Sequence, residues 1–84
     1  MELNNEEKLM SIIIMTETED VKYSCICKNT EKFRNIEEKF YEKYPKYKES
    51  NNVFELKGNK VNANKSLDYN NIDDNDIILL KTID

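Results

Sequence analysis

Residues 30–44 constrain the fold most, because they carry the pattern of a single amphipathic helix. Their apolar side chains recur every three or four residues, which places them on one helical face: Phe33, Ile36, Phe40, Tyr41 and Tyr44. Pro45 follows directly, and the residue before a proline avoids helical backbone angles. We therefore predict a helix from Thr30 to Lys43 or Tyr44, with Asn29 or Thr30 as its N-cap.

Two strand patterns precede this helix. Residues 10–15 form a short apolar run rich in β-branched side chains, typical of a strand, but both of its faces are apolar. The sequence therefore leaves open which alternation of this run faces the core. Residues 21–27 alternate, and a five-residue link to the first run favours an antiparallel hairpin. One face of the second strand carries Val21, Tyr23, Cys25 and Cys27, and the other carries Lys22, Ser24 and Ile26.

Three shorter strand patterns follow the helix. Residues 52–56 form the first, and Gly58-Asn59 after it indicates a tight hairpin turn, because such turns need positive φ. Val61 is assigned to a very short fourth strand. A charged turn at residues 73–76 leads into the final strand at residues 77–80. The predicted order is β-β-α-β-β-β, an α+β fold.

The length of 84 residues fits one small domain. Residues 1–9 are mostly polar and are predicted to form an N-terminal tail or arm. Residues 10–84 form the domain, with no internal repeat and no linker that could divide it. The abundance of Asn, Lys and Ile, whose codons are AT-rich, points to an AT-rich genome.

The composition excludes several functions. There is no histidine, which excludes Ser-His-Asp and Cys-His catalysis, and the single glycine excludes a Gly-rich phosphate loop. A net charge of −4 disfavours nucleic acid as a partner. No apolar run is long enough to cross a membrane, and the start lacks the apolar centre of a signal peptide. We expect an intracellular, cytoplasmic protein with no enzymatic activity, cofactor, metal or small-molecule substrate.

Three residue groups invite a chemical interpretation, and for each we favour a structural one. Cys25 and Cys27 are too few for a metal site and are predicted to be core residues of a strand. The acidic stretch 68–76 lacks the spacing of a calcium loop and is expected to be a solvated turn. The tyrosines are expected mainly to pack the end of the helix against the sheet.

The order and spacing of these segments resemble a ubiquitin-like β-grasp domain. A hairpin leads into the helix through residues 27–30, and the helix ends at Tyr44-Pro45. Gly58 ends the third strand, and Leu67, Ile72 and the closing strand follow at the family's spacing. The resemblance covers residues 10–83 and implies a mixed sheet packed on one helix.

The same resemblance implies a function in protein binding. Conjugated members of the family end in Gly-Gly, whereas this chain ends Lys81-Thr82-Ile83-Asp84, so we expect a module that is not conjugated. Its binding surface is predicted on the sheet face, at Ile26, Glu55, Leu79 and Lys81. The partner is expected to be a protein. The alternatives are a small structural subunit of a large assembly and a modifier whose Gly-Gly tail lies beyond this chain.

Overall fold

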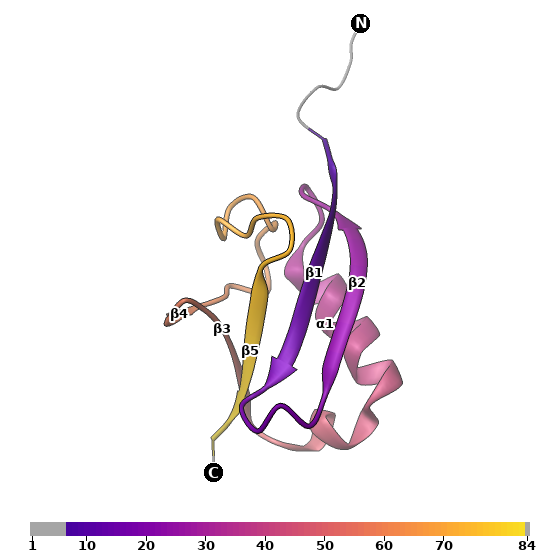
Figure 1. The fold of residues 1–84 in the computed structure, drawn as a ribbon, viewed down its shortest axis with the longest axis vertical. Helices are drawn as coiled ribbons and strands as arrows, with labels where there is room; N and C mark the ends of the chain where they lie inside the picture. The colour runs from indigo at the N-terminus through magenta and orange to yellow at the C-terminus, as the bar shows by residue number, and fades with distance from the viewer. Residues whose placement is uncertain (1–6, 84) are drawn as a thin grey trace, which may run out of the picture.

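The computed structural model describes residues 7–83, which form a five-stranded sheet with one α-helix packed against one of its faces (Figure 1). The elements are β1 (Leu9–Thr16), β2 (Lys22–Lys28), α1 (Phe33–Lys43), η1 (Pro45–Glu49), β3 (Asn52–Leu56), β4 (Asn59–Lys60) and β5 (Ile77–Thr82). The strands lie in the order β2-β1-β5-β3-β4, with β1 and β5 parallel and the other pairs antiparallel. The predicted α+β class and element order are confirmed. The short 3₁₀-helix η1 connects α1 to β3.

The alternation of β1 that the sequence left open is settled by burial. Met10, Ile12 and Ile14 are buried toward α1, so Ile13 and Met15 point to the opposite side of the sheet. On β2 the predicted alternation is confirmed. Cys27 is buried on the inner side, and Ile26 is exposed on the outer side.

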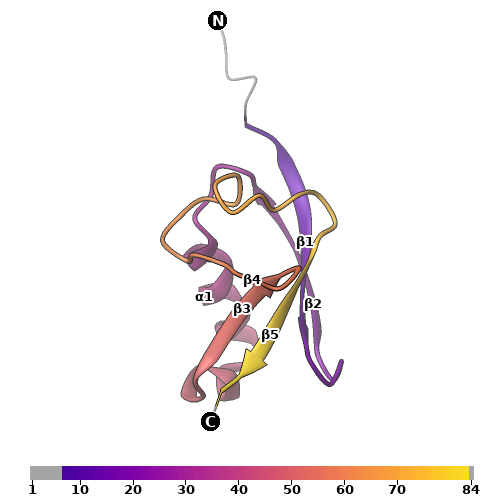
Figure 2. The same ribbon diagram turned by 90° about the vertical axis from the view of Figure 1, so that its left-hand side faces the viewer.

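The core lies between α1 and the inner side of the sheet, and Figure 2 shows α1 on that side. Phe33, Ile36 and Phe40 of the helix are fully buried. The Phe40 ring contacts an aromatic cluster, in which its centroid lies 5.3 to 6.3 Å from each neighbouring ring: Tyr23, Tyr41, Tyr44, Tyr47 and Phe54. The expectation that tyrosines pack the end of the helix is confirmed for these residues. Tyr69 is the exception, being 64% exposed.

The predicted start of the helix was wrong by three residues. α1 begins at Phe33, and its N-cap is Lys32, which makes no side-chain capping bond. The backbone N–H groups of Phe33 and Arg34 donate instead to carbonyls of the loop at Lys65 and Ala63, at 3.0 and 2.9 Å. These loop carbonyls satisfy N–H groups that a helix start otherwise leaves without a partner, so no capping side chain is needed.

Asn29, a predicted N-cap, is buried and joins three segments of the chain. Its Oδ1 accepts a hydrogen bond from the backbone N–H of Lys8 at 2.7 Å, and its Nδ2 donates to the Asp68 carboxylate at 2.7 Å. Its own backbone N–H donates to the carbonyl of Lys8 at 3.0 Å. Asn29 thus ties the start of β1 to the loop that precedes β5.

The hairpin between β3 and β4 turns one residue earlier than predicted. Leu56 pairs with Asn59, so the two-residue loop is Lys57-Gly58 rather than Gly58-Asn59. Both loop residues have positive φ, +51° and +86°, as a type I′ turn requires. Val61, expected inside the fourth strand, lies just after β4 and is buried.

The start of β1 overlaps the predicted N-terminal tail. β1 begins at Leu9, one residue inside the predicted tail 1–9. Residues 1–6 of that tail lie outside the described residues. Within residues 7–83, no helix has the length and apolar character needed to cross a membrane.

Candidate protein-binding face

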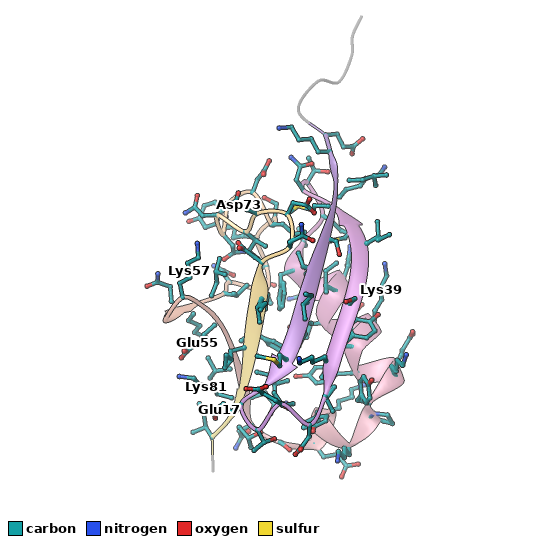
Figure 3. The ribbon with its side chains drawn as sticks, viewed as in Figure 1. Glu17, Lys39, Glu55, Lys57, Asp73 and Lys81 are labelled. Carbon is teal, nitrogen blue, oxygen red and sulfur yellow. The ribbon has the colours of Figure 1, made fainter. Side chains whose placement is uncertain are left out.

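The side of the sheet that α1 does not cover, here called the outer face, faces the viewer in Figure 3. The strand register and alternation place fourteen side chains on it: Leu9, Ser11, Ile13, Met15, Lys22, Ser24, Ile26, Lys28, Val53, Glu55, Lys60, Ile77, Leu79 and Lys81. All of them are half-buried or exposed. The outer face is therefore a continuous surface to which all five strands contribute.

The centre of the outer face is apolar. Ile13 lies beside Ile77, and Met15 lies beside Leu79, on the parallel pair β1–β5. Ile77 is 46% exposed, and the other three side chains are half-buried. Central parallel strands in other folds are apolar on both faces because both faces are covered. Here α1 covers only the inner face, so the chain leaves an apolar surface open.

Three of the four predicted site residues lie together at one edge of this apolar centre. Glu55 pairs with Leu79 across β3 and β5. The Lys81 Nζ lies 3.0 Å from the Glu55 Oε1, and Figure 3 shows the two side chains next to each other. The hydrogen bond to Glu55, reinforced by the Glu55 charge, raises the pKa of Lys81 above its ordinary value.

Ile26, the fourth predicted residue, lies on the same face but away from that group. It pairs with Ser11 on β1, four residues from Met15, which corresponds to roughly 13 Å along the strand. Its side chain is 71% exposed, and that of Leu9 on the neighbouring strand is 73% exposed. Leu9 and Ile26 therefore form a second apolar surface at the other end of the outer face.

The central residues Ile13, Met15 and Ile77 were not among the predicted site residues. The resemblance predicted binding residues on β3 and β5. The apolar centre instead lies on β5 and β1. A signal was present in the sequence. Residues 12–15 and 77–80 are apolar at every position, more than one buried face requires.

Lysines border the outer face at both edges of the sheet. Lys22 lies on β2, and Lys60 lies on β4 opposite Glu55. Neither lysine forms an ion pair with any residue of 7–83. Glu55, the one carboxylate among the fourteen, is already paired with Lys81.

The cysteines occupy structural positions. Both thiols are free, and Cys27 is buried with its Sγ 3.8 Å from the Met10 carbonyl oxygen. Burial, followed by the proximity of Cys25, raises the pKa of Cys27 to about 12. Such a thiol is a poor nucleophile and a poor metal ligand at neutral pH. In the part of the chain that the structure describes, no group of three or more His, Cys, Asp or Glu side chains could hold a metal ion.

The acidic turn before β5 has a structural role. The Asp74 Oδ1 accepts a hydrogen bond from the backbone N–H of Ser11 at 2.7 Å, and Asp76 Oδ2 accepts one from the Asp73 N–H at 2.8 Å. The Asp76 carbonyl accepts a bond from Ile13 N–H at 3.0 Å. The turn thus closes against β1, which sets the parallel register of β1 and β5.

Comparison with known proteins supports the fold. No protein-family model matches the chain, and no curated protein matches it. Among solved structures, a protein designed de novo on the basis of ubiquitin matches with a TM-score of 0.74 at 20% sequence identity, over 88% of both chains. The chain therefore has a ubiquitin-like β-grasp fold.

Proposed function

We propose that this protein is a non-catalytic ubiquitin-like module that binds another protein, without covalent attachment, through its outer face. The observation that carries the proposal is the apolar centre formed by Ile13, Met15, Ile77 and Leu79. These side chains are incompletely covered, and each square ångström of apolar surface removed from water contributes about 25 cal/mol. A partner seated on the sheet would remove much of this surface from water.

The arrangement of the outer face supports a protein as the partner. Its apolar centre has a rim of charged side chains, among them Lys22, Glu55, Lys60 and Lys81. An apolar core surrounded by a polar rim is the usual composition of protein interfaces. The strands also hold the backbone of these residues in a fixed register, so binding does not have to order that backbone.

Affinity capture from a cell extract tests this proposal. The full chain carries an affinity tag, and the captured proteins are compared with those of two variants, Met15→Asp and Leu79→Asp. Glu38→Lys is the matched control, because Glu38 is exposed on α1 on the other side of the sheet. Circular dichroism confirms that each variant is folded.

We expect the wild type and Glu38→Lys to capture the same proteins, and both aspartate variants to lose them. A buried aspartate without a partner opposes binding strongly, so the loss should be nearly complete. Retention of every captured protein by both folded aspartate variants would contradict the assignment of the outer face.

A further inference from the structure

We infer that the segment seated on the outer face combines apolar side chains with carboxylates, and this inference rests on the proposed function. The inference is based on the charges that surround the apolar centre. Among the fourteen outer-face residues there are four lysines and one glutamate, whereas the whole chain has a net charge of −4. The strands of the outer face thus carry net positive charge on an acidic protein, while the β1–β2 turn next to Lys22 and Lys81 carries the carboxylates of Glu17, Glu19 and Asp20.

The existing ion pairs leave two of these lysines available. Lys81 forms an ion pair with Glu55 at 3.0 Å, and Lys28 at the end of β2 forms one with Glu7 at 3.7 Å. Lys22 and Lys60 form no ion pair within residues 7–83, and both are exposed. A bound carboxylate near either lysine would therefore gain a partner without breaking an existing ion pair.

The positions of Lys22 and Lys60 determine where those carboxylates belong. Lys22 is the register partner of Met15 on one side, and Lys60 is the register partner of Glu55 on the other. Met15, Leu79 and Glu55 link them across the sheet. The partner segment accordingly has apolar side chains in its middle and carboxylates toward both ends.

Electrostatic specificity follows from this placement. An acidic segment is repelled by the net charge of the chain at long range, and is attracted only where the lysines border the apolar centre. A basic segment would meet Lys22 and Lys60, and like charges brought together at an interface oppose binding. The charges therefore allow the outer face to distinguish acidic apolar segments from basic ones. Apolar contact alone would not make this distinction.

Three synthetic peptides of equal length test the inference on the full chain. The first has leucines flanked by glutamates, the second has the same leucines flanked by lysines, and the third has the same glutamates with serine in place of leucine. Titration followed by amide chemical shifts of the labelled protein gives the affinity of each peptide. We expect only the Glu/Leu peptide to bind on the outer face, with an affinity that falls as salt is added.

Charge reversal tests the role of the two lysines. We expect the double variant Lys22→Glu/Lys60→Glu to lose about tenfold in affinity for the Glu/Leu peptide and to gain affinity for the Lys/Leu peptide. The control is Lys46→Glu/Lys48→Glu, which makes the same change of charge on η1, outside the outer face. It should leave both affinities within about twofold, because exposed charges at a distance are largely screened.

The outcomes separate this inference from the proposed function. Equal or tighter binding of the Lys/Leu peptide, or no binding of any peptide, overturns the inference of an acidic apolar partner. The capture experiment with Met15→Asp and Leu79→Asp decides the proposed function independently. A chain that loses its captured partners in those variants, yet prefers the Lys/Leu peptide, keeps the proposed function and loses this inference.

Discussion

Met15 of β1 and Leu79 of β5 are register partners in the parallel strand pair, and both side chains lie on the sheet face that α1 leaves open. Their chain neighbours Ile14 and Ile78 are fully buried on the other face. The two central strands are therefore apolar on both sides although only one side is covered. This relationship is the structural basis of the proposed binding function.

Leu79 and Leu80 form a matched pair that separates the two faces of β5. Leu80 is 2% exposed in the core, whereas Leu79 is half-buried on the outer face. We expect Leu80→Ala to lower the free energy of unfolding by about 2–5 kcal/mol, because it leaves a cavity. Leu79→Ala should cost about 1 kcal/mol or less. Urea unfolding measures both, and equal losses would contradict the assignment of the faces.

Asn29→Ala tests the junction between β1 and the loop that precedes β5. The variant loses the side-chain bonds to the Lys8 backbone and to Asp68, so we expect the free energy of unfolding to fall by about 1–3 kcal/mol. Thr30→Ala is the control, because Thr30 is exposed and α1 has no side-chain cap; it should cost about 0.5 kcal/mol or less. A loss for Thr30→Ala as large as that for Asn29→Ala would contradict the assignment of this junction to Asn29.

The geometry of the Lys57-Gly58 turn predicts opposite changes in stability for two substitutions. Nothing lies within 4 Å of a Cβ added at Gly58, so Gly58→Ala is disfavoured only by the φ of +86° and should cost about 1–2 kcal/mol. Lys57→Asn places Asn-Gly in a type I′ turn, where asparagine tolerates positive φ, and should add about 0.5 kcal/mol. Thermal unfolding of the two variants checks both signs, and a stabilising Gly58→Ala would contradict the turn geometry.

The buried Cys27 thiol predicts a loss of stability at alkaline pH. Its pKa is about 12 in the folded protein, against an ordinary value of 9.0. Above pH 9 the unfolded chain therefore releases a proton that the folded chain keeps, and the unfolded state is favoured as the pH rises. We expect the free energy of unfolding to fall less between pH 8 and pH 10.5 in Cys27→Ala than in the wild type. Identical slopes would show that this thiol ionises equally in both states.

The sequence predicted those parts of the fold that short-range patterns determine. The stripe of Phe33, Ile36 and Phe40 identified the buried face of α1, and alternation identified the inner face of β2. Pro45 correctly indicated where the helix ends. The role of Asn29 could not be predicted, because its partner Asp68 lies 39 residues away and only the folded loop brings them together.

The candidate site was predicted only in part, because some of its neighbours are brought together by pairing between distant strands. Glu55, Leu79 and Lys81 follow from the register of two antiparallel strands, and the structure brings them together. The apolar centre depends on the parallel pairing of β1 and β5, whose residues are more than sixty positions apart in the chain. No local pattern specifies that register, so Ile13 and Ile77 were not recognised as neighbours.

Chemical-shift mapping of the labelled chain with a partner recovered by affinity capture tests the central claim most directly. We expect the largest amide shifts on β1 and β5, at Ile13, Met15, Ile77 and Leu79, with smaller shifts at Lys22 and Lys60. The exposed side of α1, represented by Glu38, should change little. Large shifts along α1 together with unchanged amides at these four apolar positions would contradict the proposal that the outer face binds the partner.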